Sequence, residues 1–446
     1  MGRDKKHLSP VQTITFAFAA VTFCGALLLM LPFASRSGES ASFIDALFTA
    51  TSASCVTGLT VGDTYTLWSP FGQAVIIMLI QVGGIGIITL AMYFLSMLHA
   101  KIGMRNVFVL QEIMGTDSPA GLVKMTGFIA KGIFLQEFIG AVLLMPVLIP
   151  DFGVVRGILY SFFHSVSAFC NAGFDLMGYK GGTSLTAYSD NFYFNIIISL
   201  LITFGGIGFF VWLDLIKHKF KFEKLTLHSK IVVVTSLALT FGGALLFFIL
   251  FYNSEAADGM TLYEKGIASL FQSVSARTAG FYTIDLAKIG GAAQMLMIAL
   301  MLIGGSSVST AGGIKTTTFA VILLFVRSIF RGKEDVECFG RRIEKGVIRT
   351  AIAVFVLYIG LALGAGIAIS AIEGADIVAC LFETFSAIAT VGLSLSLTPT
   401  LSAVSKLIII ILMFLGRVGG ITVLLSLSGK KNDSAYRYPA ENITVG

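Results

Sequence analysis

Four glycines, each a few residues after a Ser-Ala pair, are the best candidates in this chain for a binding site built from backbone atoms. Glycine tolerates positive φ and lets one backbone approach another closely. Four such turns around one axis would line a path with carbonyl oxygens, and carbonyls can replace the hydration shell of a monovalent cation. The four copies are Phe48, Ser52, Ala53, Gly58 and Leu59; Phe163, Ser167, Ala168, Gly173 and Phe174; Phe271, Ser275, Ala276, Gly280 and Phe281; and Phe382, Ser386, Ala387, Gly392 and Leu393.

The glycine pattern marks an internal repeat. From Gly58 to Gly173 is 115 residues, from Gly173 to Gly280 is 107, and from Gly280 to Gly392 is 112. This spacing indicates that one structural unit of about 110 residues occurs four times. The third copy is one residue shorter than the others and carries Arg277 between its Ser-Ala pair and its glycine.

The composition is that of a membrane protein. Hydrophobic residues make up 56% of the 446, charged residues only 13%, and the mean hydropathy is +0.88. A soluble protein of this length would need far more charge to cover its surface. The chain is therefore predicted to cross the membrane several times.

The lengths of the apolar stretches predict the elements that position the glycines. A bilayer core of about 30 Å needs about 20 apolar residues per helix, and 10 to 14 are too few. Each repeat has a long stretch, a short one that ends near the Ser-Ala pair, and a second long one. The long stretches are residues 11–33, 71–98, 127–148, 192–215, 231–252, 295–326, 351–372 and 407–427, and the short ones are 43–54, 154–169, 267–276 and 377–389. We expect an all-α polytopic protein with eight transmembrane helices, in which each repeat reads span, short re-entrant helix, span.

The predicted short helices would bring the four glycine turns to one path through the membrane. Irregular backbone at membrane depth is tolerated only where protein or a water-filled cavity satisfies its polar groups. The negative C-terminal ends of four short helices would also favour a cation. Phe and Ser, four residues apart, share one helix face, and we expect the phenylalanines to pack and the serines to bond the backbone.

Basic residues predict the orientation. Residues 3–6, 101–105, 217–230, 327–349 and 430–437 hold 20 of the 31 lysines and arginines, whereas the opposite loops hold six. Because cytoplasmic loops are rich in Lys and Arg, both termini are predicted to be cytoplasmic and the glycine turns to open outside. This bias explains the net charge of +6, so contact with membrane lipids is favoured over a nucleic-acid partner. The first stretch is long enough for a retained helix rather than a cleaved signal peptide.

A second glycine pattern lies further along the long stretches. It comprises Gly83-Gly84, Gly205-Gly206, Gly304-Gly305 and Gly419-Gly420. In the first, second and fourth repeats, close helix packing is the favoured explanation. In the third, residues 304–313 contain nine poor helix formers and are followed by Lys315, so a continuous helix is not expected there. Lys315 could repel cations or extend to the cytoplasmic interface, and the sequence leaves both readings open.

Several ionisable groups lie where they could have a functional role. Arg417 lies in an apolar stretch, where a charge costs at least about 2.5 kcal/mol and is functional by default. Asp63, Asp175 and Asp285 follow their glycines and could attract cations, although exposed loop aspartates are common. His164 is expected to be a packed neutral histidine rather than a proton relay. The cysteines show no zinc spacing, and we assign them neither a metal nor a disulfide.

These motifs together resemble one superfamily. Thr390-Val391-Gly392-Leu393 begins like the Thr-Val-Gly-Tyr-Gly filter of potassium channels, and it comes with four equivalent glycines after four short stretches. The whole chain resembles the Trk/Ktr/HKT superfamily of potassium transporters, most closely the membrane subunit of bacterial Ktr systems. That resemblance implies four helix, pore helix, helix units around one pore, in a bacterial plasma membrane. The units would be residues 8–100, 118–222, 226–333 and 344–429, followed by a cytoplasmic tail at 430–446.

The resemblance also implies the roles of individual residues. The selectivity filter would comprise Thr57, Gly58, Ala172, Gly173, Ala279, Gly280, Val391 and Gly392, with potassium at the four glycines. Glycine rather than serine at position 58 implies potassium selectivity. An intramembrane loop at 304–314 would gate the pore, with the gate formed by Gly304, Gly305, Ser306, Gly312, Gly313, Lys315 and Arg417. We expect Arg417 to hold this loop closed through loop carbonyls or hydroxyls.

The implied partners are a second copy of the chain and a cytoplasmic ring of nucleotide-binding regulatory subunits of the RCK type. Residues 217–230, 327–349 and the tail after 430 are the expected contacts. No cofactor is expected on this chain, potassium is its substrate, and sodium stays open as an activator. The alternative function is a sodium-coupled potassium symporter, although four parallel units are unlike the inverted repeats of many carriers. An enzyme is not expected, because no convergent set of catalytic groups is found.

Overall fold

The computed structural model describes residues 10–86, 122–180, 183–419 and 441. The basic segment 101–105 and the tail at 430–446, apart from Glu441, lie outside the described residues. The helices are α1 (Pro10–Leu29), α2 (Phe43–Ser54), α3 (Thr64–Leu67), α4 (Pro70–Ile85), α7 (Leu122–Phe152), α8 (Val154–Phe169), α9 (Phe192–Gly206), α10 (Phe209–Lys217), α11 (Leu227–Phe251), α12 (Leu262–Ser275), α13 (Gly291–Leu302), α14 (Thr316–Phe330), α15 (Lys345–Glu373), α16 (Ile377–Ile388) and α17 (Ala403–Val418). Strands β1 (Glu337–Cys338) and β2 (Arg341–Arg342) form a small antiparallel hairpin.

In each unit a long helix is followed by a shorter one at the predicted short stretch, but within the described residues the second long stretch is not observed as one long helix. The short helices α2, α8, α12 and α16 lie on the four short stretches, and each ends a few residues before its glycine. Four helices of the described residues are long and apolar enough to cross a membrane by themselves: α1, α7, α11 and α15. Helices α4 and α17 lead into residues outside the description, so the count of eight spans stays a prediction.

Two of the expected spans are not continuous helices. The stretch 192–215, predicted as one span, is divided into α9 and α10, which meet at an angle of 93°. Gly208 at the break has φ +96°, a value that L side chains rarely adopt, and this explains the bend. The stretch 295–326 is divided into α13 and α14 by an irregular segment, as its poor helix formers predict.

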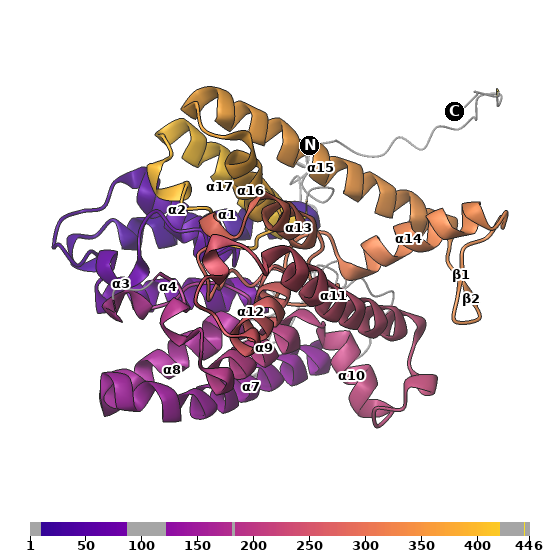
Figure 1. Cartoon of the computed structure of the whole chain (residues 1–446), viewed down its shortest axis with the longest axis horizontal. Helices are drawn as coiled ribbons and strands as arrows, with labels where there is room; N and C mark the ends of the chain where they lie inside the picture. The colour runs from indigo at the N-terminus through magenta and orange to yellow at the C-terminus, as the bar shows by residue number, and fades with distance from the viewer. Residues whose placement is uncertain (1–9, 87–121, 181–182, 420–440, 442–446) are drawn as a thin grey trace, which may run out of the picture.

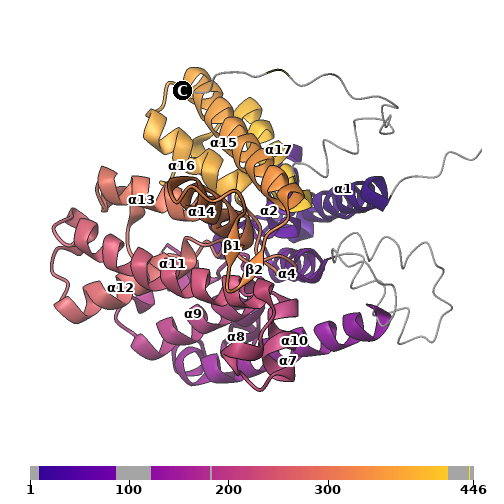
Figure 2. The ribbon, with the colours of Figure 1, turned by 90° about the vertical axis from the view of Figure 1, so that its right-hand side faces the viewer.

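The units pack in a closed order around a common centre. In each unit the first long helix packs along the short helix, in the pairs α1 with α2, α7 with α8, α11 with α12 and α15 with α16. The second long helix then contacts the short helix of the following unit: α4 meets α8, α9 meets α12, α13 meets α16, and α17 returns to α2. Both ribbon views show the four units surrounding the middle of the molecule in chain order (Figures 1 and 2). The short helices are thereby brought together at the centre.

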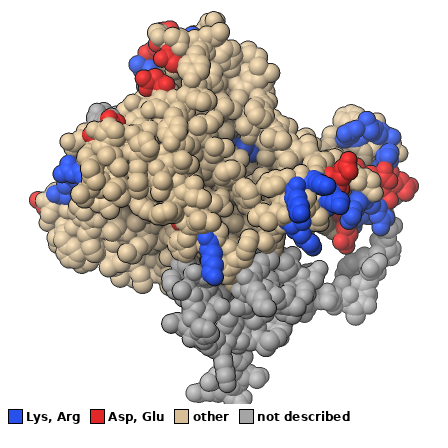
Figure 3. Space-filling view, turned by 90° about the horizontal axis from the view of Figure 1, so that it is seen from below, with Lys and Arg blue, Asp and Glu red and all other residues tan. Residues whose placement is uncertain are grey.

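The surface is divided between a broad apolar body and charged ends. Many large hydrophobic side chains are exposed on the long helices, among them Phe241 (63%) on α11 and Val356 (63%) on α15. The face in Figure 3 carries few charges over its middle, and its charged side chains lie around the margin, most densely at the right-hand end. Exposed apolar surface on this scale would be unfavourable in water and suits a lipid environment.

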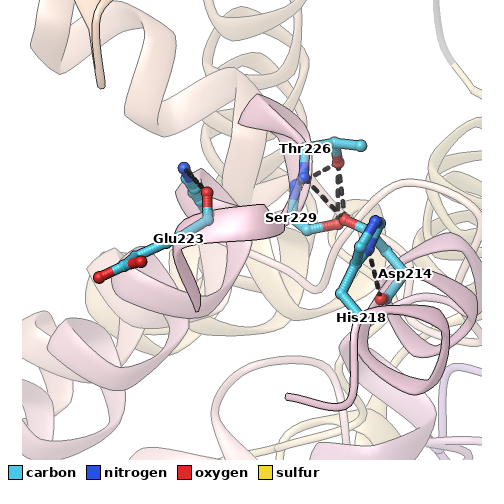
Figure 4. A network of polar contacts seen from close by, with 6 residues as sticks. Asp214, His218, Glu223, Thr226 and Ser229 are labelled. Atoms are coloured by element: carbon cyan, nitrogen blue, oxygen red, sulfur yellow. Dashed lines mark hydrogen bonds and ion pairs between the residues drawn. The ribbon is translucent and has the colours of Figure 1, made fainter. Parts of the chain in front are cut away.

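A polar cluster fastens the end of α10 to the start of α11 (Figure 4). The Asp214 carboxylate accepts hydrogen bonds from the Thr226 amide and hydroxyl, both at 2.9 Å, and pairs with His218 at 2.9 Å. Thr226 is also the N-cap of α11 and accepts from the Ser229 amide. The connection from α10 to α11 is therefore a hydrogen-bonded turn.

Candidate functional site

The four glycines predicted from the repeat meet around one axis. Gly58, Gly173, Gly280 and Gly392 all have positive φ, at +98°, +70°, +81° and +95°. A β-carbon on Gly58 would lie 3.1 Å from the Cα of Gly173, and one on Gly173 would lie 3.0 Å from the Cα of Gly280. One on Gly280 would lie 3.3 Å from the Cα of Gly392, and one on Gly392 would lie 2.8 Å from the Cα of Gly58. The four turns thus form a closed ring in chain order.

Carbonyl oxygens fill the spaces between the glycines of the ring. A β-carbon at Gly58 would lie 2.5 Å from the Ala172 oxygen, one at Gly173 2.9 Å from the Ala279 oxygen, and one at Gly280 2.5 Å from the Val391 oxygen. At Gly392 it would overlap the Thr57 oxygen. Any side chain at these positions would collide with the backbone of the next unit, which explains the requirement for glycine.

Each turn is held by its own short helix. The amides of Thr57, Ala172 and Val391 donate to the carbonyls of Ser52, Ser167 and Ser386 at 2.7–2.8 Å. The residue two before each glycine also has positive φ: Val56, Asn171, Thr278 and Thr390. The glycine turns therefore share one backbone conformation, which the local hydrogen bonds maintain.

The serine hydroxyls bond the backbone, as predicted, but in two different ways. In the first and fourth units the hydroxyls of Ser52 and Ser386 accept from the amides of Gly58 and Gly392, at 3.1 and 3.0 Å. In the second and third units the hydroxyls of Ser167 and Ser275 donate to the carbonyls of Phe174 and Phe281. The first and fourth units, which are adjacent in the ring, share one pattern and the second and third share the other, so opposite units differ and the ring is not four-fold symmetric at this level.

The shorter third copy still reaches the ring. The Ala279 amide bonds the Ser275 carbonyl at 2.9 Å, through a turn one residue tighter than in the other units. Arg277 is only 8% exposed, and its guanidinium donates to the Thr240 hydroxyl on α11 at 2.6 Å. The arginine therefore extends toward its own long helix and leaves the carbonyl position to Ala279.

A cavity of about 190 Å³ opens above the ring. All four glycines line it, together with Asp63 and Asp175. Both aspartates are fixed by backbone amides, Asp63 by Thr66 at 2.8 Å and Asp175 by Met177 at 3.0 Å. Asp285 does not line the cavity; it caps the turn Leu286–Lys288 through the Ala287 amide. Two of the three predicted aspartates therefore face the approach to the ring.

In the second and fourth units, the residue that follows the phenylalanine of the repeat forms hydrogen bonds with residues just after the ring glycine. His164 is fully buried; its Nδ1 lies 2.7 Å from the Tyr160 carbonyl, and its Nε2 accepts from the Leu176 amide at 3.2 Å. It is a packed histidine, as predicted. Glu383, at the equivalent position in α16, bonds the hydroxyls of Ser394 and Thr398. Its polar role was not foreseen, although its alignment with His164 in the repeat could have suggested it.

The irregular segment between α13 and α14 crosses beneath the ring. Its two ends are joined by the bond from the Gly304 amide to the Ile314 carbonyl, at 2.8 Å. Its middle is tied to the second unit, because the Ser306 amide donates to the Gly206 carbonyl at 2.8 Å and the Thr310 hydroxyl to the Phe169 carbonyl at 3.0 Å. A β-carbon on Gly312 would overlap the Thr390 hydroxyl of the fourth unit. The predicted gate residues Gly304, Gly305, Ser306, Gly312 and Gly313 are therefore all packed between neighbouring units.

Arg417 joins this segment to two other parts of the chain. Its guanidinium donates to the carbonyl of Thr310 in the segment and to the carbonyl of Gly83 at the end of α4, the latter at 2.6 Å. The predicted contact between Arg417 and loop carbonyls is thus present. Lys315 does not reach outward; its ammonium donates to the segment's own Ala311 carbonyl at 2.8 Å.

The position of Arg417 corrects one prediction about the second glycine pattern. Gly83, Gly205 and Gly416 each pack against the carbonyl of the last residue of a short helix, namely Ser54, Phe169 and Ile388. The fourth copy therefore begins at Gly416, not at Gly419, and Gly416 follows its ring glycine by 24 residues as Gly304 does. Arg417 consequently takes the place that Gly84 and Gly206 occupy in their units. The spacings in the other three units, 25, 32 and 24 residues, do not distinguish Gly416 from Gly419, so the packing was needed to decide between them.

Comparison with known proteins agrees with this architecture. The TrkH family, described as cation transport proteins, matches residues 6–436. The chain is 43% identical to the potassium/sodium uptake protein NtpJ of Enterococcus hirae, over 100% of this chain and 99% of NtpJ. It is 38% identical to the Ktr system potassium uptake protein B of Bacillus subtilis, over 99% and 97%, and 35% identical to that of Vibrio alginolyticus, over 100% and 96%.

Among solved structures, the chain is similar to the crystal structure of the potassium transporter TrkH from Vibrio parahaemolyticus. The TM-score is 0.75 at 17% identity, over 96% of this chain and 87% of that one. At this identity the likeness shows the fold, which is helical and TrkH-like. The relatives are transporters rather than enzymes, as the sequence predicts. From the match across nearly its whole length and the identity to these relatives, the chain belongs to the TrkH family of cation transport proteins.

Proposed function

We propose that this protein takes up potassium across the bacterial plasma membrane through the ring of Gly58, Gly173, Gly280 and Gly392. The observation that carries the proposal is the closure of the ring: the carbonyls of Thr57, Ala172, Ala279 and Val391 each face the glycine of an adjacent unit. Relatives named for potassium uptake support the choice of ion.

The chemistry of the ring suits a monovalent ion that sheds water. Neutral carbonyls can replace a hydration shell without holding the ion so tightly that it cannot leave. Divalent cations are usually bound by carboxylates, and within the ring the polar groups are backbone oxygens. Asp63 in the cavity above would raise the local cation concentration without entering the ring.

The segment 304–314 serves in this proposal as the gate. It crosses the pathway below the ring and is bonded to Gly206, Phe169 and Arg417, which belong to the second and fourth units. Opening would require these bonds to break together. Because Arg417 also bonds Gly83, it couples the segment to the first unit and is placed to stabilise the closed position.

Regulation is proposed to come from partner chains. Two copies of the protein would dock on a cytoplasmic ring of nucleotide-binding RCK-type subunits, in keeping with relatives named as components of Ktr systems. The basic connectors 217–230 and 327–349 would provide contacts, with both termini on the cytoplasmic side. Nucleotide control would act through this cytoplasmic ring, and potassium is the substrate, with sodium left open as an activator.

A second candidate function is sodium-coupled potassium symport. The observation that favours it is the name of the 43% identical relative, a potassium/sodium uptake protein. A carrier would move potassium uphill when only a sodium gradient is supplied, whereas a channel would not. The two functions are separated by whether potassium accumulates under that condition.

The test is ion flux into proteoliposomes that contain the full-length protein. Uptake of potassium, rubidium and sodium is compared in the parent, in Gly58→Ser, and in Gly132→Ser as the matched control. A β-carbon at Gly132 meets nothing within 4 Å, so this variant should behave as the parent. We expect potassium preference in the parent that Gly58→Ser relaxes toward sodium. If selectivity is the same in all three, the ring is not the filter and the proposal fails.

A further inference from the structure

A second, larger cavity lies away from the ring, between the first and second units. Its volume is about 680 Å³, within the range of sites that hold a drug-sized ligand. Helix α4 forms one wall and α8 the other, while the segment after α1 and the residues around α3 cover one end. No residue of the ring or of the gate segment lines it.

The covered end of this cavity is positively charged. Arg36 and Arg156 both line it and are exposed to solvent. Among the described residues no carboxylate forms an ion pair with either guanidinium, and that of Arg36 lies over the Tyr65 ring at 4.0 Å. Arg156 is in the first turn of α8, whose N-cap Gly153 supplies no side-chain hydrogen bond. The guanidinium groups of Arg36 and Arg156 therefore lie beside the positive N-terminal end of α8. This arrangement favours the binding of an anion.

The rest of the cavity is apolar and extends along the helices. From Ser69 at the start of α4 to Ile77 is eight residues, and from Arg156 to Val166 on α8 is ten, so the walls extend roughly 12–15 Å at 1.5 Å per residue. This part of the cavity is lined by Ala74, Ile77, Leu159, Phe162, Phe163 and Val166. Leu159 is 61% exposed at the open side. The groove thus has a cationic head and an apolar body that is open to its surroundings.

We propose that this groove binds an anionic phospholipid, with the phosphate between Arg36 and Arg156 and one acyl chain along α4 and α8. Guanidinium groups bind phosphate through paired hydrogen bonds. An acyl chain matches the length and the apolar lining of the groove, which a free phosphate would leave uncovered. Because the groove is charged at one end only, a lipid with one anionic end matches it better than the apolar helix face of a second protein copy does.

Occupancy of the groove would reach the ring through α8. Phe163, the signature phenylalanine of the second unit, lines the groove, and so does Leu176, three residues after Gly173. The Leu176 amide is bonded to His164. A lipid chain in contact with both residues would support the short helix and the segment beyond its glycine. Anionic lipid is thus a structural component of the second unit.

The test counts bound lipid on the purified full-length protein by native mass spectrometry, with phosphatidylglycerol and phosphatidylcholine as probes. Arg36→Gln/Arg156→Gln removes the head site, and Ala74→Trp fills the body of the groove without changing charge. Lys288→Gln is the control: it also removes a base from a connecting segment, but this lysine is paired with Glu255 at 2.8 Å and lies outside the groove.

The parent should retain phosphatidylglycerol in preference to phosphatidylcholine. The double arginine variant should bind it roughly 30-fold more weakly, about fivefold for each charge removed, and Ala74→Trp should also reduce retention, whereas Lys288→Gln should not.

Equal retention in every variant would overturn the proposal. So would displacement of the lipid by inorganic phosphate with no effect of Ala74→Trp, which would assign the arginines to free phosphate. Loss of dimers with unchanged lipid would assign the groove to a second copy. Since the readout is bound lipid and not flux, the result is independent of which ion the ring conducts.

Discussion

The glycine ring and the segment 304–314 are both irregular backbone at the centre of the molecule, but they are maintained in opposite ways. Each turn of the ring is held by its own unit, through the bonds of Ser52, Ser167, Ser275 and Ser386. The segment occurs in one unit only, and bonds from Gly206, Phe169 and Arg417 of other units hold it. A structure held locally keeps its shape when units move, whereas one held by its neighbours is released when they move. This difference suits a filter in the first case and a gate in the second.

A side chain that closes the ring sterically should have the largest effect on ion flux. Gly392→Ala places a methyl group on the Thr57 carbonyl at a φ of +95°, and such backbone strain alone costs about 1–3 kcal/mol. We expect potassium flux into proteoliposomes to fall to background, while Gly132→Ala, with open space around it, keeps the parent rate. Normal flux in Gly392→Ala would show that ions do not pass the ring.

The segment is tested by removing the arginine that ties it to its neighbours. Arg417→Ala deletes charged hydrogen bonds to the Thr310 and Gly83 carbonyls, each worth about 1.5–3 kcal/mol. We expect leak flux without the regulatory ring to rise by roughly 10- to 100-fold, because the closed position loses this stabilisation, while the preference for potassium over sodium is unchanged.

A change of selectivity together with the leak in Arg417→Ala would contradict the division of roles, since it would mean that the arginine shapes the ring as well. Lys315→Met is the companion variant. It removes a cation whose bonds stay within the segment, and we expect a smaller rise in leak than for Arg417→Ala.

Removing one hydrogen bond between a short helix and its ring glycine should have a smaller effect on ion flux than the changes above. Ser386→Ala removes the acceptor of the Gly392 amide at 3.0 Å, which costs about 1–3 kcal/mol for a buried donor left unpaired. We expect a partial loss of potassium preference, measured as the ratio of potassium to sodium flux. Ser405→Ala, at the start of α17 and away from the ring, is the control. An unchanged ratio in Ser386→Ala would mean that contacts between units alone maintain the ring.

The smallest expected effect concerns the cavity above the ring. Asp63→Asn removes a negative charge that lines the cavity but keeps a side-chain acceptor for the Thr66 amide. We expect slower uptake at low potassium and low ionic strength, with the difference disappearing in 1 M salt because surface charge is then screened. Asp285→Asn, outside the cavity, should behave as the parent at every salt concentration. A salt-independent loss in Asp63→Asn would instead indicate a structural role.

Much of the ring could be predicted from the sequence, because its contacts are short in sequence and repeated. The ends of α2 and α8 fall on the predicted residues, at Ser54 and Phe169, and the conserved spacing within each copy places the serine beside its glycine. In every unit the serine of the pattern bonds the backbone at or next to its glycine, either as an acceptor or as a donor. In the third copy, which is one residue shorter, the spacing alone does not show which residue's carbonyl lies beside the ring glycine.

The class of the protein, the positions of the short helices and the glycines of the turns could all be inferred from the amino-acid sequence. How these parts meet depends on tertiary packing. The bend between α9 and α10, the register of Gly416 with Gly83, and the reach of Arg417 to the Gly83 and Thr310 carbonyls were not determined by spacing alone. Local conformation depends on neighbouring residues and can be inferred from them, whereas the partners of a long polar side chain depend on the packing of elements more than 100 residues apart in the chain.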